Sequence, residues 1–348
     1  MLLLVYPTTS WCAQCTPSFP EKEGWLGGDA AYSVPLDVDR SLWLFADTYV
    51  GFPAQKTRRG TRLVANSIAI SNCRDDSFNI HYYIPAQRAG VSLPFFDSAT
   101  SAYRYWPMDG FTYDGRLYVV LSGIAAKPGG TPFDFKMVGV KLAAIKNPLD
   151  DPSRWSIEYS EVASGPVAFP GVAAVLARRW VYLFAVLADV DHPTHPLMLT
   201  RIALEHLDKP AASMEYLAKD GGWKHGLDWS DARIVIEDGH TEMSVRYHPH
   251  IRKWVAVQQK PGIGTGAGVR TADHLEGPWS AFEGWFLMAE PPHDADDKIF
   301  CYAAKEHIEF ARDSDIVITY VCNSFDPAKL ADDMSLYRPQ VVRLPLQR

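Results

Sequence analysis

Two aspartates in the stretch from Trp25 to Gly51, WLGGDAAYSVPLDVDRSLWLFADTYVG, are the residues best placed to do chemistry. The pattern predicts a β-hairpin with strands over 29–36 and 42–50, joined by a polar turn. Asp29 begins the first strand, and Asp47 lies near the end of the second. Because hairpin strands are antiparallel, we expect both carboxyl groups at the same end, close enough to share a site. Two neighbouring carboxyl groups can act as a proton donor and as a base or nucleophile.

The more informative of the two is Asp47, because it interrupts the apolar run LWLFADTYV. Strands disfavour Asp, and a buried carboxylate requires partners. Residues that break a local pattern in this way are often functional. The alternative is that Asp47 ends the strand and bonds to Thr48.

The second strand of this hairpin has four counterparts along the chain. The five segments are LWLF from Leu42, LYVVL from Leu117, WVYLF from Trp180, WVAVQ from Trp254 and IVITY from Ile316. Each follows a polar or basic turn and another short strand, and the repeat of roughly 60 to 75 residues leaves room for about four strands. Strong helical periodicity is nearly absent. The sequence therefore predicts an all-β fold, a five-bladed β-propeller with about four antiparallel strands per blade.

We expect a single propeller domain over residues 21–348, with its last strand over 337–346 completing a blade and closing the ring. Residues 1–20 resemble the remnant of a signal peptide followed by a tail, although the basic start of such a signal is missing. The expected location is therefore outside the cytoplasm, in the periplasm or the medium.

Charge and composition argue against nucleic acid and membranes as binding partners. The 348 residues carry a net charge of −7, and no basic stripe points to nucleic acid. No apolar run reaches the length of a membrane span, and we expect a monomer.

The spacing of the cysteines and histidines argues against a redox site and against a zinc site. The motif from Cys12 to Cys15 imitates a redox motif, but prolines follow it where that motif requires a helix. Cys301 and Cys322 lie in adjacent expected strands and either pair or remain buried thiols. The 11 His residues follow no zinc spacing, so we expect no cofactor, with a structural calcium in the channel left open.

In a propeller, the first strand of each blade lines the central channel. The residues that begin the five expected first strands would therefore ring one mouth: Asp29, Asp109, Gly171, Glu242 and His307. The ends of the second strands would reach the same face with Asp47, Ser122, Gln258 and Asn323. Such a ring suits a polyhydroxylated ligand, although channel mouths are often polar for solvation alone.

The segments GWLGGDAAYSVPL, LWLFADTYVG and NSIAI resemble the first blade of a largely uncharacterised propeller family, similar to the endo-D-arabinanases of glycoside hydrolase family 183. The resemblance continues through YWPMDGFTYDGRLYVVL, HTEMSVRYHP and CYAAKEHIEFA, so it spans nearly the whole chain. It implies a five-bladed propeller in which two first-blade aspartates, here Asp29 and Asp47, carry the chemistry. Ala46 stands where that family commonly has Gly.

The resemblance implies a glycosidase acting on a carbohydrate that contains arabinofuranose. Asp29 is then the expected base or nucleophile with Asp47 as its partner, and Glu242 is the alternative acid. The expected substrate-binding residues are Asp109, Trp106, Arg246, Lys305, His307, Asn323 and Asn66. A non-catalytic carbohydrate-binding propeller and a sugar phosphorylase, whose phosphate Arg104, Arg246 and Lys305 would bind, are the alternatives.

Overall fold

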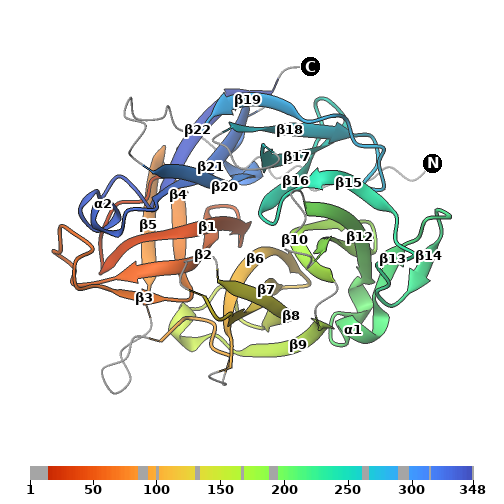
Figure 1. Ribbon diagram of the computed structural model, residues 1–348, viewed down its shortest axis with the longest axis horizontal. Coiled ribbons are helices and arrows are strands. Elements are labelled where there is room, and N and C mark those ends of the chain that lie inside the picture. Colours follow the sequence, from red (N-terminus) through yellow and green to blue (C-terminus); the bar gives the residue numbers. More distant parts are fainter. Residues whose placement is uncertain are drawn as a thin grey trace.

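The computed structural model describes residues 15–84, 93–98, 102–129, 134–165, 168–187, 195–260, 266–288, 298–312 and 315–346. Five antiparallel sheets stand around a central channel like the blades of a propeller (Figure 1). The predicted fold class, an all-β five-bladed β-propeller, is confirmed.

The first strand of each blade lines the channel, and the remaining strands follow outward in order. The first blade contains β1 (Trp25–Pro35), β2 (Arg40–Val50), β4 (Ser67–Arg74) and β5 (Ser77–Tyr83), with β3 (Arg62–Val64) paired to the end of β2. The second contains β6 (Arg104–Tyr113), β7 (Arg116–Ala126), β8 (Phe135–Ile145) and β9 (Ile157–Ser164). The third contains β10 (Ala168–Ala177), β11 (Trp180–Leu187), β12 (His195–Ala203), β13 (Glu215–Leu217) and β14 (Trp223–His225), and β15 (Ile234–Gly239) pairs with β12.

The last two blades come from the C-terminal third of the chain. The fourth contains β16 (Met243–His248), β17 (Lys253–Gln259), β18 (Gly266–Ala272) and β19 (Glu283–Leu287). The fifth contains β20 (Ile299–Glu306), β21 (Asp315–Ser324) and β22 (Pro339–Pro345). Short helices α1 (Pro210–Ser213) and α2 (Pro327–Asp332), and the single 3-10 turns η1 (Pro152–Arg154), η2 (Leu204–His206) and η3 (Ile308–Phe310), lie in the connections.

The core lies between blades, and β2 shows why its sequence is apolar on both faces. Leu42 and Leu44 pack in one cluster with residues of the second blade. Trp43 and Phe45 point to the opposite face, where they meet Phe310 and other residues of the fifth blade. Since successive strand residues face opposite sides, a strand between two blades needs an almost continuous hydrophobic run.

Most of the channel-lining strands carry an irregularity near the middle. The pairing register shifts around Asp29 in β1, around Asp109 in β6, around Gly171 in β10, and between Tyr302 and Lys305 in β20. Bulges of this kind bend a strand and change the direction of its side chains. In four blades, the bulge therefore decides which side chains reach the channel.

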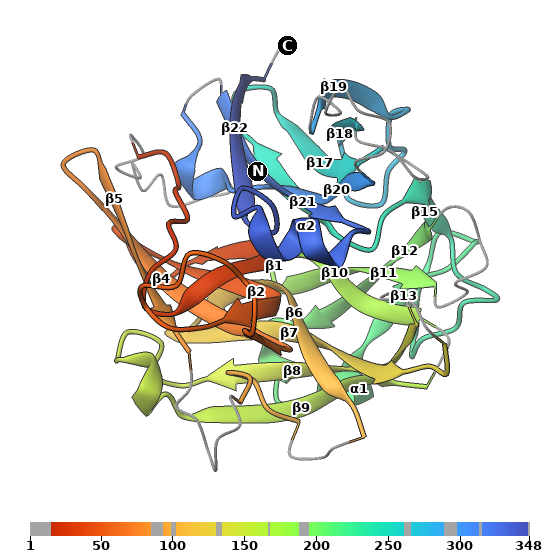
Figure 2. The ribbon, with the colours of Figure 1, turned by 60° about the vertical axis from the view of Figure 1, so that its left-hand side comes forward.

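The last strand completes the fifth blade, as the sequence predicts, and side-chain contacts of Arg58 join that blade to the first. β22 completes the fifth blade by pairing with β21. The buried guanidinium of Arg58 donates to the backbone oxygens of Leu26 in the first blade (2.7 Å) and of Leu330 and Asp333 (2.9 and 3.0 Å) in and beside α2. Figure 2 shows α2 close to the first blade.

Two disulfides fasten strands to their surroundings. Cys15 pairs with Cys73, and Cys301 pairs with Cys322 across β20 and β21. Of the two alternatives for Cys301 and Cys322, a disulfide or two buried thiols, the structure shows the disulfide. Cys12 lies outside the described residues. None of the helices in the described ranges has the length and apolar character that a membrane crossing would require.

Candidate active site

In four blades the end of the second strand lies beside the early part of the first, but Asp109 and Gly171, which were expected to begin first strands, lie inside β6 and β10. Gly28 lies opposite Thr48, and Trp106 lies opposite Ser122. Met243 pairs with Gln258, and Phe300 pairs with Asn323. The residues after the start of each first strand therefore lie beside the end of its second strand, as the antiparallel pattern requires.

Asp29 is held from the fifth blade. The hydroxyls of Tyr302 and Tyr337 donate to its Oδ2 at 2.8 and 3.0 Å. Its other oxygen, Oδ1, is shielded from solvent and has no hydrogen-bond partner among the described residues. Burial, followed by the negative charges of Asp47 and Glu242, raises the pKa of Asp29 to about 8. Asp29 therefore keeps its proton at neutral pH.

Asp47 has partners that favour its charged form. Trp106 Nε1 donates to Asp47 Oδ1 at 2.9 Å, and Arg104 Nε lies 3.8 Å from the same oxygen. Burial raises the pKa of Asp47 above its usual value, whereas Arg104 and the Trp106 N–H oppose that rise. Among the residues that the structure describes, no ion pair joins Asp29 to a cation as Arg104 joins Asp47, so Asp47 is the better place for the shared negative charge.

Glu242 stands just before β16 in the fourth blade, where Lys305 holds it. Lys305 Nζ lies 3.4 Å from Glu242 Oε1 and donates to the backbone oxygens of Ala30 and Ala303. Burial lowers the pKa of Lys305, and its ammonium also lies over the Tyr32 ring, 4.3 Å from the centroid. Lys305 thus connects the bulge of the first blade to the acid of the fourth.

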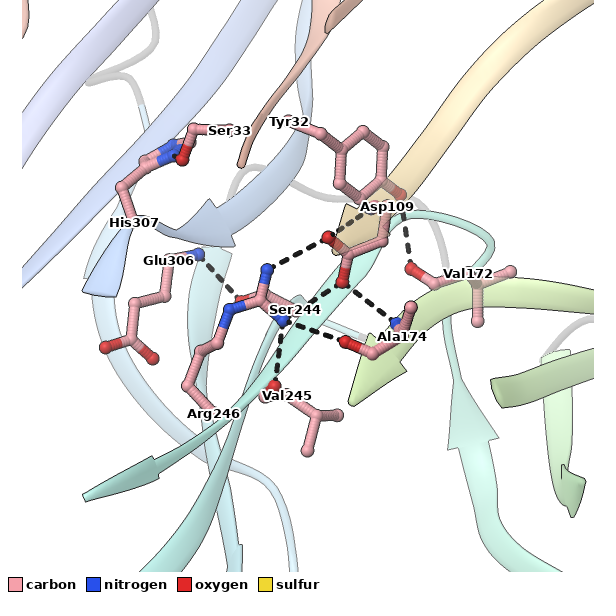
Figure 3. Close-up of polar contacts among 11 residues, drawn as sticks. Tyr32, Ser33, Asp109, Val172, Ala174, Ser244, Val245, Arg246, Glu306 and His307 are labelled. Atoms are coloured by element: carbon pink, nitrogen blue, oxygen red, sulfur yellow. Dashed lines mark hydrogen bonds and ion pairs between the residues drawn. The ribbon is translucent and has the colours of Figure 1, made fainter. Parts of the chain in front are cut away.

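Deeper in the channel, Asp109 and Arg246 form a buried ion pair (Figure 3). Both guanidinium nitrogens donate to the two carboxylate oxygens at 3.0 Å, and the backbone N–H groups of Gly110 and Ala174 donate to them at 2.9 Å. The pair joins the second, third and fourth blades. With every Asp109 oxygen occupied, this pair supports the site from below instead of presenting free groups to a ligand.

His307 is not at the mouth, and this prediction was wrong. It follows β20 instead of beginning it, because the strand is the earlier segment Ile299–Glu306. Its buried ring bonds to Ser33 Oγ at 2.6 Å and to Thr319 Oγ1 at 2.7 Å. The apolar and aromatic residues of IFCYAA pair with β21, so the polar HIE segment is left to form a turn.

Asn66 also has a structural role. Its buried amide donates to the backbone oxygens of Phe96 and Tyr105 and accepts from the Phe96 N–H, with distances of 2.7–2.9 Å. Asn323, in contrast, lies at the mouth, with Nδ2 3.5 Å from the Tyr302 hydroxyl. Of the expected binding residues, the structure therefore brings Trp106, Lys305 and Asn323 beside the three acids.

The sequence did not reveal Tyr302 and Tyr337, and His240 was considered only as one of the histidines that follow no zinc spacing. The two tyrosines reach Asp29 from the opposite end of the chain, so no local pattern could reveal them. His240 lies two residues before Glu242, and its ring is 5.8 Å from that of His195. Burial lowers the pKa of His240 to about 3, so its ring is neutral. Within the described ranges, no three His, Cys, Asp or Glu side chains gather as a metal ion would require.

Several solved structures superpose on this fold. A protein from Bacteroides ovatus, provisionally classed as a hydrolase, superposes with a TM-score of 0.71 at 15% identity, covering 92% of this chain and 86% of that one. A levansucrase variant from Bacillus subtilis gives 0.50 at 14% identity over 96% and 89%. An endo-arabinase from Bacteroides thetaiotaomicron gives 0.48 at 11% identity over 95% and 98%.

At the level of sequence, the chain belongs to the family described as "Domain of unknown function (DUF5005)", whose profile matches residues 16–345. A search of curated proteins finds no match. The match covers nearly all of the propeller, and the candidate site lies inside it.

Proposed function

We propose that the protein hydrolyses glycosidic bonds in a polysaccharide or oligosaccharide at the channel mouth. The observation that carries this proposal is the unequal pair formed by Asp29 and Asp47. One carboxyl group keeps its proton and has an oxygen without a hydrogen-bond partner among the described residues, while the other is contacted by Arg104 and Trp106, which favour its charged form. Glycoside cleavage requires that combination of an acid and a carboxylate.

The hydrogen bonds assign the two roles. Since Oδ2 of Asp29 accepts two tyrosine hydroxyls, the proton is assigned to Oδ1, which makes Asp29 the acid of the pair. Asp47 then attacks the sugar or activates water. This reverses the sequence expectation, in which Asp29 was the base. Glu242, instead of donating a proton itself, keeps Asp29 protonated through its charge.

Several observations support a carbohydrate outside the cytoplasm as the substrate. Trp106 lies beside Asp47, and aromatic rings commonly pack against the apolar faces of sugars. The resemblance to the family 183 arabinanases adds arabinofuranose as the first sugar to test. Two disulfides suit an oxidising compartment, which agrees with the proposed export.

A product screen tests this function. The wild type and the Asp47→Asn variant are incubated with arabinan, arabinogalactan and other polysaccharides, with and without phosphate. We expect the wild type to form new reducing ends. The variant should form them at a rate lower by a factor on the order of 10² or more. Retained binding without any product would instead indicate a carbohydrate-binding propeller.

The phosphate arm of the screen addresses the phosphorylase alternative. Of its three expected basic residues, Arg246 is paired with Asp109 and Lys305 is engaged by Glu242 and backbone oxygens. Arg104 remains at the mouth, with its side chain 45% exposed. Sugar phosphate formed only in the presence of phosphate would assign the protein to the phosphorylases.

A further inference from the structure

A row of three aromatic rings on the fifth blade leads away from Asp29 toward solvent. The Tyr302 and Phe300 rings are stacked, with centroids 5.7 Å apart and planes inclined by 21°. The Phe300 and Phe325 rings follow at 4.4 Å and 31°. Phe325 is 53% exposed, while Phe300 and Tyr302 are half-buried. We call these three residues the aromatic shelf.

The local structure explains why the rings form a row. Tyr302 and Phe300 are two residues apart in β20, so their side chains point to the same face of the strand. Phe325 follows the end of β21, and its N–H donates to the Lys298 oxygen at 3.0 Å, which places it beside the start of β20. The row is therefore built from the two strand ends that reach the channel mouth.

The shelf is continuous with the proposed catalytic group. The Tyr302 hydroxyl donates to Asp29, and Asn323 Nδ2 lies 3.5 Å from that hydroxyl. A ligand that places its scissile bond at Asp29 and extends along the fifth blade would thus contact an aromatic ring and hydrogen-bonding groups. Because each ring of the row packs on the next, the row offers ring edges and the exposed surface of Phe325. Such an apolar surface beside polar groups suits a sugar ring, which has an apolar face and a rim of hydroxyls.

A second aromatic group lies on the opposite side of the carboxyl pair. Trp106 of the second blade bonds to Asp47, and its ring meets Phe135 at 4.7 Å. Arg104 lies over Trp106, with its guanidinium carbon 5.7 Å from the ring centroid. Aromatic surfaces thus flank Asp29 and Asp47 from two different blades.

We propose that the aromatic shelf is a carbohydrate subsite that binds sugar residues beyond the bond being cleaved. The ligand is accordingly a chain of several sugar residues that extends from the carboxyl pair across Tyr302, Phe300 and Phe325. This inference rests on the proposed function, because it takes the carboxyl pair as the point of cleavage.

The test measures how the effect of shelf variants depends on chain length. Wild type, Phe325→Ala and Phe300→Ala are compared on arabinofuranosyl oligosaccharides from the disaccharide to the octasaccharide. The Phe52→Ala variant is the matched control, because Phe52 is 79% exposed and lies outside the shelf. We expect kcat/KM on the longest chains to fall between about twofold and about tenfold in each shelf variant. The disaccharide and the control should be unaffected, and Phe325→Trp should retain wild-type values.

Calorimetric binding of the octasaccharide to Asp47→Asn, with and without Phe325→Ala, separates the two proposals. If the wild type yields no product but Phe325→Ala still weakens binding, the shelf stands and the hydrolase proposal fails. Equal losses on short and long chains, an equal loss in Phe52→Ala, or no binding of any oligosaccharide would overturn the shelf. Unchanged kinetics in both shelf variants of an active enzyme would overturn it as well.

Discussion

The hydroxyl of Tyr337 donates a 3.0 Å hydrogen bond to Asp29 Oδ2, although 308 residues separate the two in the chain. The contact joins the last blade to the first at the channel mouth. It means that the candidate acid is complete only when the ring has closed. Ring closure by Arg58 and α2 is thus tied to the geometry of the proposed acid.

The pH dependence of activity should report the pKa of Asp29. Because the proposed mechanism requires protonated Asp29, kcat/KM should fall as pH rises through about 8. Glu242→Gln removes a negative charge that raises this pKa, so the alkaline limb should move to lower pH by roughly one unit. A pH–rate profile measures the shift, with Glu158→Gln on the exposed face of β9 as control. An unmoved limb would exclude Asp29 as the titrating acid.

The two tyrosines should act on Asp29 in the opposite direction. Their hydrogen bonds favour the charged carboxylate, so Tyr302→Phe should raise the pKa of Asp29 and move the alkaline limb upward. Because the carboxyl group of Asp29 also loses a hydrogen bond that orients it, kcat should fall about tenfold. Tyr113→Phe, at the far end of β6, is the control. A change in KM alone would contradict a positioning role.

The fold was predictable because each inner hairpin repeats a hydrophobic run such as Leu42–Phe45, which both neighbouring blades require. The neighbourhood of Asp29 and Asp47 was also predictable, since antiparallel pairing follows from the hairpin alone. The partners of Asp29 were not, because Tyr302 reaches it only through ring closure and through the bulge in β20. His307 was misplaced because the polar HIE segment looked like the start of a strand.

The Asp109–Arg246 pair should be important for stability. Arg246→Met leaves the Asp109 carboxylate buried without its cation, at a cost of about 3–5 kcal/mol in the free energy of unfolding. Denaturant unfolding measures this loss. The double variant with Asp109→Leu should lose less than the sum of the two single variants, because the pair is removed together.

The exposed ion pair of Arg179 and Glu205 is the control for the buried pair of Asp109 and Arg246. Its side chains are 68% and 65% exposed, so Glu205→Gln should change the unfolding free energy by less than about 1 kcal/mol. Similar losses at the two pairs would show that burial does not determine the cost at Asp109.

The two disulfides should differ in their contribution to stability. Cys15 and Cys73 are 58 residues apart, whereas Cys301 and Cys322 are 21 apart. In the chain-entropy account, the longer loop constrains the unfolded state more, by about 1 kcal/mol. Unfolding of the Cys15→Ser/Cys73→Ser and Cys301→Ser/Cys322→Ser variants tests this order. A larger loss from the shorter loop would show that native packing of Cys301 and Cys322 dominates.

Stability itself should depend on pH through Asp29. The folded-state pKa is about 8, whereas an aspartate in the unfolded chain titrates near 3.9, roughly its ordinary value. Between these values the folded protein binds the extra proton, so the free energy of unfolding should fall as pH rises from about 4 to about 8. Asp29→Asn has no such proton, yet its amide oxygen can still accept from Tyr302 and Tyr337.

Urea unfolding of the wild type and Asp29→Asn at about pH 5 and about pH 8 isolates this contribution, because all other titrating groups are common to both. At the higher pH the variant should be more stable relative to the wild type than at the lower pH. Its free energy of unfolding should therefore change less between the two pH values. Parallel pH curves for the two proteins would mean that Asp29 loses its proton at the same pH in the folded and unfolded states. The carboxyl group would then be an anion at neutral pH, and Asp29 could not be the acid of the proposed mechanism.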